Sequence, residues 1–472
     1  MICSQQALEE YVTSAGRELQ RQLMQDQLDA RAAAEVRLEQ VTGADGVIRR
    51  RAETGHARLV ATTVGRVQVT RIAYRTPGAP NLHPADKLLS LPDGLYSFPL
   101  QRLVVHRVAG GSLRAAREAL IRGAGQYLGT RQLMQIATEA AVDIRDFYQQ
   151  AASVRPDPAG RGGNDVLVLS IDATGVNMIP SDLREPTPLR PAGPQPPSAQ
   201  LSRRERTGRT RMAVVTALYD AAPAPRTAAD ILPADAAERA ARRNGPQASS
   251  RKVDASLQHS VAPMVAALFD QAQSRDPHHQ RRWVCLVDGA NHQLECLEAE
   301  ANRRGVQIDI VVDFIHVLEY LWRAAEDLHP THPARAAFVA ATARNLLEGH
   351  APSVVADLRA RLRGRGSDNP APGLQRAIAY LHAKEPYLNY HIALTLGWPI
   401  ATGVIEGSCR YLVKDRLDIT GARWSLQGAE AILLLRAVIA NGDFDTYWQY
   451  HLNREHQRTH ASRYKDRFAL AA

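Results

Sequence analysis

The chain has 472 residues, 45% of them hydrophobic, so it is too long for one ordinary domain and apolar enough for more than one packed core. Lysine and arginine exceed aspartate and glutamate by nine (58 − 49), which favours polyanionic partners such as nucleic acid without establishing one. No run approaches the roughly 20 apolar residues of a membrane span, and the polar start with Glu9 and Glu10 does not resemble a signal peptide. We therefore expect a cytoplasmic protein without a membrane role.

The first third of the chain predicts three segments. Helical spacing over residues 1–55 indicates an N-terminal helical arm. Residues 56–100 are expected to form a β-hairpin on either side of Gly65, followed by a loop rich in proline and glycine. Residues 101–155 return to a helical pattern, with a short glycine-containing turn between two helices. This pattern fits either a helix-turn-helix that binds DNA or a helical hairpin used for packing.

A new domain is expected at residues 164–315, after the linker RPDPAGRGGND. The nearly continuous apolar run VLVLSIDATGV is typical of a buried central strand. Further strand patterns occur in RMAVVTALYDA, KVDASLQHS, RRWVCLVDG and VQIDIVVDF, and the stretch from Arg184 to Arg211 is expected to be a mobile basic loop. Three antiparallel strands followed by strand, helix and strand predict an α/β fold with a ribonuclease-H-like catalytic core, a mixed five-stranded sheet flanked by helices.

Helical patterns dominate the rest of the chain. Residues 316–395 contain successive helical patterns broken by proline or glycine, which predicts an all-helical insertion. Residues 396–442 predict two long helices that complete the core, and residues 443–472 predict a basic C-terminal tail. The four cysteines are scattered and form no C-x-x-C pair, so neither a disulfide framework nor a zinc ribbon is indicated.

Three carboxylates stand at the ends of these elements: Asp172 near the end of the first strand, Asp288 just past the fourth, and Glu406 at a helix start. Cleavage of a phosphodiester by two metal ions requires converging carboxylates that hold the ions about 4 Å apart. Oxygen ligands without histidine or cysteine clusters favour Mg²⁺ over zinc. Each residue alone has an ordinary explanation, because aspartate is common in turns after strands and Glu406 can pair with Arg410 one turn later.

Longer stretches resemble the DDE transposases of bacterial insertion sequences, close to the ISKra group and more broadly the Mutator-like class. They are ETGHARLVATTVGRVQVTRIAYRTPGAPNLHPADKLLSLPDGLYS, SIDATGV, DPHHQRRWVCLVDGANHQL, DFIHVLEYLW and GVIEGSCRYLVKDRLDITGARWSLQGAEAILLLRAVIANGDFDTYW. The resemblance runs through most of the chain and implies that Asp172, Asp288 and Glu406 are the catalytic residues and hold two Mg²⁺ (or Mn²⁺) ions. Some relatives carry paired cysteines around the N-terminal hairpin. This chain has none, so a zinc-bound recognition element is not implied.

The segment DFIH resembles an Asp-x-x-His element of that family, which makes Asp313 and His316 accessory candidates. Asp313 also ends an apolar strand, so it is an alternative to Asp288 as the second catalytic aspartate. His316 is a candidate to position the scissile phosphate or to donate to a leaving oxygen. Its ordinary explanation is a hydrogen-bonded histidine at a helix start.

Basic and aromatic side chains follow Glu406. Arg410, Lys414 and Arg423 are candidates for binding DNA phosphates, and a solvated or salt-bridged face is the alternative for each. Trp424 and Trp322 are candidates for stacking on an unpaired base, although tryptophans in helices pack more often in the core.

The resemblance also implies partners and a location. The expected partners are the terminal inverted repeats of the element and target DNA, bound at the bacterial nucleoid by a homo-oligomer because two DNA ends must be brought together. Two other functions stay open. One is an inactive, transposase-derived DNA-binding protein, and the other is a structure-specific nuclease of the same fold.

Overall fold

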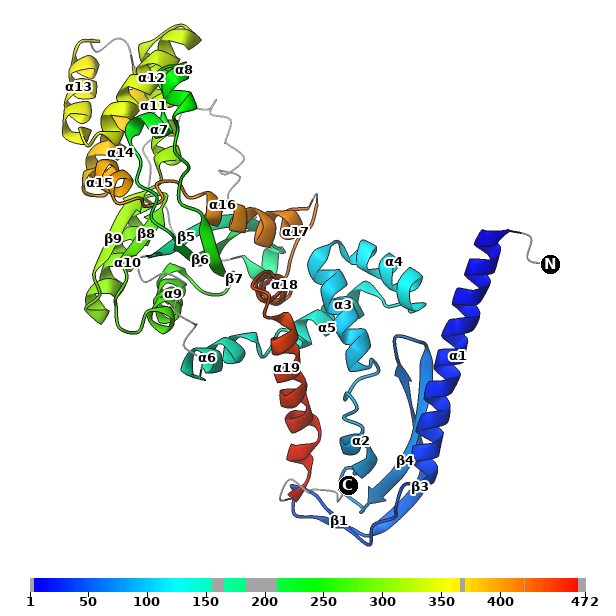
Figure 1. The fold of residues 1–472 in the computed structure, drawn as a ribbon. Helices are drawn as coiled ribbons and strands as arrows, with labels where there is room; N and C mark the ends of the chain where they lie inside the picture. The colour runs from blue at the N-terminus through cyan, green and yellow to red at the C-terminus, as the bar shows by residue number, and fades with distance from the viewer. Residues whose placement is uncertain (1–3, 155–164, 184–209, 366–369, 420, 466–472) are drawn as a thin grey trace. The chain divides into compact units, whose positions relative to one another are not determined.

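The computed structural model describes residues 4–154, 165–183, 210–365, 370–419 and 421–465. The chain divides into two compact units, Met1–Phe147 with Leu434–Ala472 and Tyr148–Leu433 (Figure 1). The predicted linker RPDPAGRGGND, apart from Asp165, lies outside the described residues, as does the predicted basic loop from Arg184 to Arg211, apart from Thr210 and Arg211, which belong to a strand. No helix in the described part of the chain is long and apolar enough to cross a membrane.

The first unit begins with α1 (Gln5–Ala33), where the Ser4 hydroxyl accepts a hydrogen bond from the N–H of Ala7 and caps the helix. The expected helical arm over residues 1–55 is wrong after Ala33. The chain forms two short antiparallel strands there, β1 (Val41–Thr42) and β2 (Ile48–Arg49). Gly46, with φ of 72°, supplies the left-handed backbone of the turn between them.

The predicted β-hairpin is confirmed. Strand β3 (Arg51–Ala61) pairs antiparallel with β4 (Arg66–Arg75), with an irregularity between Glu53 and His56. Helix α1 packs on β4, and the Gln25 side chain both donates to the carbonyl of Gln68 (2.9 Å) and accepts from its N–H (2.8 Å). This pair of hydrogen bonds satisfies backbone groups at the open edge of the hairpin.

The helical part of the first unit contains more helices than the two predicted. These are α2 (Pro84–Leu88), α3 (Phe98–Gly110), α4 (Leu113–Ala124), α5 (Thr130–Glu139) and α19 (Phe444–Thr459). Helix α6 (Ile144–Val154) starts in the first unit, and its residues from Tyr148 onward belong to the second. Helix α19 replaces most of the expected tail, because its buried Phe444, Tyr447, Trp448 and His451 recur at helical spacing.

Three-residue 3₁₀ helices occur at η1 (Pro180–Asp182), η2 (Glu385–Tyr387) and η4 (Ala461–Arg463).

A five-stranded mixed sheet forms the centre of the second unit, as the strand patterns predict (Figure 1). Its order is β7-β6-β5-β8-β9, and VLVLSIDATGV lies in the central strand. The antiparallel strands are β5 (Val166–Asn177), β6 (Thr210–Ala221) and β7 (Ala248–Ser256). Strands β8 (Trp283–Val287) and β9 (Ile308–Val312) run parallel to β5.

Both faces of this sheet are buried. Alternate residues of β5 and β8 enter a core with α9 (Val261–Arg275) and α10 (Asn291–Arg304). The other residues of these strands enter a second core that includes α11 (Phe314–Leu328) and continues through α12 (His332–Leu347), α13 (Ala351–Arg363), α14 (Pro372–Lys384) and α15 (Tyr390–Thr395). This double burial explains why the strands are apolar runs rather than alternating patterns.

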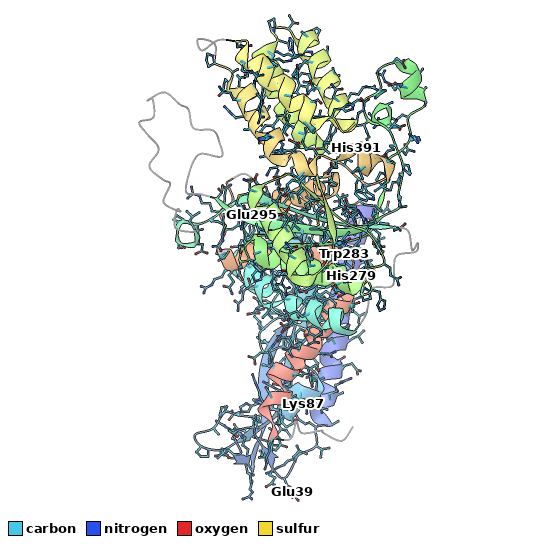
Figure 2. The ribbon with its side chains drawn as sticks, turned by 90° about the vertical axis from the view of Figure 1, so that its left-hand side faces the viewer. Glu39, Lys87, His279, Trp283, Glu295 and His391 are labelled. Atoms are coloured by element: carbon cyan, nitrogen blue, oxygen red, sulfur yellow. The ribbon has the colours of Figure 1, made fainter. Side chains whose placement is uncertain are left out.

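Trp283 anchors the start of β8. Its indole N–H donates to the Asp276 carboxylate (2.9 Å), and its ring lies 5.1 Å from that of His279 (Figure 2).

Short helices α7 (Ala228–Ile231) and α8 (Ala236–Ala240) follow β6. The first of the two long helices expected in residues 396–442 is interrupted. It consists of α16 (Gly403–Ser408), a π-helical turn (Cys409–Lys414) and α17 (Asp415–Leu417), before α18 (Leu426–Ala440).

Candidate active site

The parallel strands bring three aspartates to one edge of the sheet. In-register pairing of β5 with β8, and of β8 with β9, ends one residue before an aspartate on each strand. Asp288 and Asp313 directly follow β8 and β9, whereas Asp172, expected near the end of the first strand, lies inside β5, which stays paired with β6 as far as Asn177. Because carboxyl ends of parallel strands meet at the same edge, the three aspartates are neighbours although the chain separates them widely.

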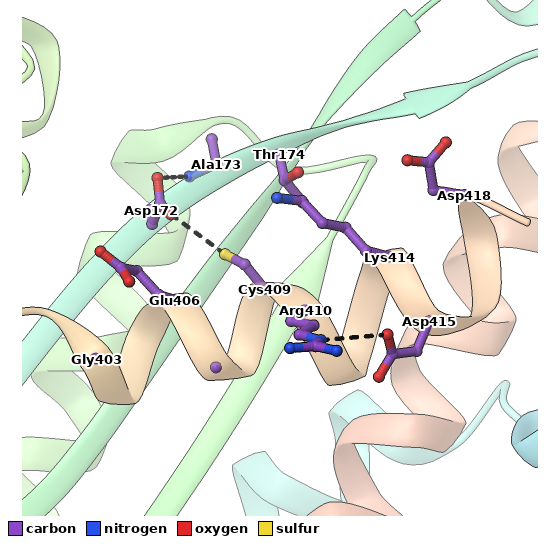
Figure 3. A pocket seen from close by; sticks show the side chains of 11 residues that line it. Asp172, Ala173, Thr174, Gly403, Glu406, Cys409, Arg410, Lys414, Asp415 and Asp418 are labelled. Atoms are coloured by element: carbon purple, nitrogen blue, oxygen red, sulfur yellow. Dashed lines mark hydrogen bonds and ion pairs between the residues drawn. The ribbon is translucent and has the colours of Figure 1, made fainter.

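Glu406 reaches the same edge from helix α16. It lines a pocket of about 710 Å³ together with Asp172, and Figure 3 shows the two side chains near one another at one end of that pocket. The pocket is lined by Asp172, Ala173, Thr174, Gly403, Glu406, Gly407, Cys409, Arg410, Lys414, Asp415 and Asp418. The first and third predicted carboxylates therefore share one cavity.

Asp172 lies in an electrostatically unfavourable position. One of its oxygens accepts from the N–H of Ala173 (2.6 Å), and the other accepts from the thiol of Cys409 (3.4 Å). Burial raises the pKa of Asp172, and the negative charges of Asp288 and Glu406 raise it further. Two further carboxylates close to a buried Asp172 therefore concentrate negative charge that a cation would offset.

The turn after β8 holds Asp288. Its side chain accepts from the N–H of Ala290 (2.9 Å), and its carbonyl accepts from the hydroxyl of Tyr380 (2.8 Å). Gly289 has φ of 87°, and a Cβ atom there would lie 2.8 Å from the Tyr380 hydroxyl. The close approach of Tyr380 therefore depends on glycine at this position.

Asp313 lies deeper, with 2% of its surface exposed. It is the N-cap of α11, and its Oδ1 accepts from the N–H of Ile315 (3.0 Å) and of Thr402 (3.3 Å). Its Oδ2 accepts from the Thr402 hydroxyl (2.7 Å). Burial raises the pKa of Asp313, and Glu406 adds to the effect. Of the two alternatives for the second aspartate, Asp288 is the more exposed and Asp313 the more completely hydrogen-bonded.

His316 lies in the first turn of α11. Its Nδ1 is 3.8 Å from a carboxylate oxygen of Glu319, and its ring packs 5.5 Å from Tyr320 and 5.8 Å from Tyr380. The side chain is 31% exposed. Tyr380 donates a hydrogen bond to the Asp288 carbonyl, so its side chain connects His316 to the turn that holds Asp288.

The basic candidates differ in position. Arg410 and Lys414 both line the pocket, where the π-helical turn changes their spacing from that of an α-helix. Arg410 is 80% exposed and lies 3.8 Å from Asp415. Arg423 is exposed and does not belong to the pocket lining. Both pocket side chains are placed to meet an anion beside the carboxylates.

The tryptophans pack against neighbouring side chains. Trp424 is 8% exposed, donates its indole N–H to the Leu417 carbonyl (3.0 Å), and lies under the Arg416 guanidinium, 4.7 Å from the ring centre. Trp322 stacks on His332, with 5.7 Å between ring centres. A buried ring offers no free face to a base, so the position of Trp424 favours packing over base stacking.

Three residues that contact the acidic residues of the site were not predicted from the sequence: Thr402 and Cys409, which contact carboxylates, and Tyr380, which contacts the backbone carbonyl of Asp288. Thr402 and Cys409 lie one helical turn before and after Glu406, so helical spacing was an available signal for both. Tyr380 comes from α14, and only the fold places it beside Asp288.

One group of three ligand-type side chains has its ligand atoms within 4.8 Å of one another in the described part of the chain. It is Asp143, His451 and Glu455, in the first unit, and by distance it could hold a metal. However, Asp143 accepts two hydrogen bonds from Arg458 (2.7 and 2.6 Å) and one from His451 (2.8 Å). A guanidinium already neutralises this carboxylate, so the arrangement is that of an ion-pair network.

Comparison of the chain with models of protein families and with curated proteins finds no match. The features that indicate a function are therefore those of the site itself. Asp172 and Asp288 lie side by side on neighbouring parallel strands, Glu406 lines a pocket with Asp172, and two basic side chains line the same pocket.

Proposed function

We propose that this chain is a DNA transposase of the DDE type, in which Asp172, Asp288 and Glu406 hold two Mg²⁺ (or Mn²⁺) ions. The observation that carries the proposal is the in-register pairing of β5 with β8, which sets Asp172 beside Asp288, while Glu406 lines a pocket with Asp172. The strand order β7-β6-β5-β8-β9, with three antiparallel and two parallel strands, supports a ribonuclease-H-like core. The helices after β9 would then be an insertion in that core.

The donor set fits a hard divalent cation. All three side chains offer carboxylate oxygens, the ligands that Mg²⁺ and Mn²⁺ prefer. The raised pKa of Asp172 reflects its burial and the uncompensated charge of the other two carboxylates, which a divalent cation would offset. When bound, two such ions would activate the attacking oxygen and stabilise the leaving oxygen of the phosphodiester.

The protein's own side chains would bind and orient the DNA. Arg410 and Lys414 would hold the phosphate against the carboxylates, because both lie in the same pocket. Water would attack first and nick the element's end. The freed 3′-hydroxyl would then attack the target strand, without a covalent intermediate on the protein.

The first unit is the candidate for recognition of the terminal repeats. Helices α4 and α5 are joined by a turn at Gly125, which has φ of 62°, and α4 carries Arg114, Arg117 and Arg122. A helix-turn-helix of this kind would fit the major groove of DNA. A homo-oligomer would bring two such ends together.

Substitution of each carboxylate tests the proposal. We expect Asp172→Ala, Asp288→Ala and Glu406→Ala to abolish Mg²⁺-dependent cleavage of DNA bearing the element's ends, while binding of that DNA stays close to wild type. Cleavage without joined products would indicate a nuclease, and binding without cleavage by the wild type would indicate an inactive DNA-binding protein. Normal cleavage by Asp288→Ala would move the second role to Asp313.

A further inference from the structure

Thr402 connects two carboxylates of the candidate site. Its hydroxyl oxygen lies 2.7 Å from Oδ2 of Asp313 and 3.0 Å from Oε1 of Glu406. Its backbone N–H donates to Oδ1 of Asp313 (3.3 Å). Thr402 is 4% exposed and Asp313 is 2% exposed, so the contact between them is shielded from bulk water, whereas Glu406 is exposed.

The surrounding backbone fixes Asp313 in place. Its own N–H donates to the carbonyl of Val287 (2.7 Å), and the next residue, Phe314, donates to the carbonyl of Ile400 (2.9 Å). Its two carboxylate oxygens receive three hydrogen bonds, from Ile315 and Thr402. A carboxylate whose oxygens already serve protein donors is better suited to hold a neighbour than to bind a cation.

Within the described residues, the Glu406 carboxylate accepts no hydrogen bond from a backbone N–H. It lies four residues after Thr402, its side chain is exposed, and its long side chain has many rotamers. The Thr402 hydroxyl carries one hydrogen and can donate to one carboxylate at a time. When the hydroxyl donates to Glu406, the Thr402 N–H still holds the residue to Asp313.

We infer that Asp313 and Thr402 are positioning residues for Glu406: Asp313 fixes Thr402, and the Thr402 hydroxyl fixes the glutamate carboxylate toward Asp172. The inference rests on the proposed function and deepens it. It assigns Asp313 to the support of the site and leaves the second metal-binding place to Asp288.

Binding of Mn²⁺ to the full chain, followed by electron paramagnetic resonance of the free ion, tests this arrangement. We expect Thr402→Val to weaken Mn²⁺ binding about 10- to 100-fold, the usual range for residues that orient a metal ligand, and Thr402→Ser to bind like the wild type. Asp313→Asn should weaken binding to a similar extent. The double variant should lose little beyond either single variant, because the two residues act in series.

The matched control is Thr342→Val, which removes another buried threonine hydroxyl of the same unit and should leave Mn²⁺ binding unchanged. Thermal unfolding of every variant shows that it is folded, and Thr402→Ala replaces the valine variant if that one unfolds. Wild-type binding by a folded variant lacking the Thr402 hydroxyl would overturn the inference. So would an Asp313→Asn variant that loses binding as completely as Asp172→Asn does, because Asp313 would then be a ligand. Failure of the wild-type chain to bind Mn²⁺ would instead defeat the proposed function itself, and the inference with it.

Discussion

At the scale of single residues, Gly289 shows how one backbone position supports the candidate site. It combines φ of 87° with contact to the Tyr380 hydroxyl, which is bonded to the carbonyl of Asp288. Gly289→Ala should therefore destabilise the protein in two ways. An alanine in the left-handed conformation costs about 1 to 2 kcal/mol, and its Cβ atom would also displace the Tyr380 hydroxyl. Urea unfolding and the Mg²⁺ dependence of cleavage would measure the two effects.

The matched control for this prediction is Gly305→Ala. Gly305 has φ of 68° and no atom within 4 Å of an added Cβ, so it tests backbone strain alone. We expect Gly289→Ala to be the more destabilising of the two and to be the one that changes the Mg²⁺ dependence. Equal effects in both assays would show that the Tyr380 contact contributes nothing.

The thiols give a second prediction for single residues. Burial raises the pKa of Cys409, and the adjacent Asp172 carboxylate adds to the effect, so the thiol stays protonated near neutral pH. Burial likewise raises the pKa of Cys285. Of the three described cysteines, only Cys296 is partly exposed. Iodoacetamide at pH 7.5 should modify Cys296 well before Cys285 or Cys409, as measured by peptide mass spectrometry.

Rapid labelling of Cys409 would show that its contact with Asp172 opens readily. The thiolate is the reactive form, so labelling of all three residues should increase as the pH rises toward their pKa values. The absolute rate of labelling changes with pH for all three cysteines, so the order in which they react is the measurement that reports their burial.

At the scale of elements, the network around Asp143 joins the start of α6 to α19. Burial alone would raise the pKa of Asp143, but hydrogen bonds from Arg458 and His451 outweigh it and hold the pKa well below its usual range. Asp143→Asn should lower the free energy of unfolding by about 3 kcal/mol. This value is the low end of the range for breaking a buried ion pair, and we choose it because Arg458 is 39% exposed. Urea unfolding at pH 7 would measure this loss.

The same network predicts a dependence on pH. A carboxylate whose pKa is lowered by folding stabilises the protein above its unfolded pKa, about 3.9, and this contribution is lost as the pH falls below that value. The difference in stability between wild type and Asp143→Asn should therefore shrink below about pH 4. Glu118→Gln, which removes an exposed ion pair with Arg114, should change stability little at any of these pH values.

The sheet was predictable from the sequence and several helices were not. Continuous apolar runs identified β5 and β8 because both faces of these strands are buried, and the turn residues after Val287 marked the end of β8. The Ala-Thr-Gly sequence after Asp172 is typical of a turn, but β5 continues through it to Asn177 because it stays paired with β6. The end of α1 at Ala33 was missed because the residues that follow keep a helical composition, and the Gly-Ala-Asp-Gly sequence at residues 43–46 is the signal that indicated the short hairpin. The π-helical turn after α16 leaves no periodic signal in six residues.

The candidate site divides in the same way. Asp172 and Asp288 could be proposed from their places after apolar runs, since such runs are local features of the sequence. The bond from Thr402 to Asp313 joins residues 89 positions apart, and no spacing rule reaches that far. Residues that support a site from other elements therefore become visible only in the fold.

At the scale of the whole molecule, the net charge of +9 and the carboxylate site predict that DNA binding and DNA cleavage are separable steps. Removal of divalent metal with EDTA should stop cleavage while DNA binding persists, because the positive side chains need no cation. Binding should weaken steeply as salt rises, since each neutralised phosphate releases counterions. Gel shift and nicking assays in parallel would measure both. Loss of DNA binding on EDTA treatment would contradict this separation.

The division of the chain has a consequence for its synthesis on the ribosome. Asp143 and His451 belong to the same unit but are 308 residues apart, and all of Tyr148–Leu433 is made between them. At about 5 to 20 residues per second, the nascent chain carries an unpaired Asp143 for roughly 15 to 60 s. The second unit is contiguous and can close its core during that interval, whereas the first unit is completed only when the last helix emerges.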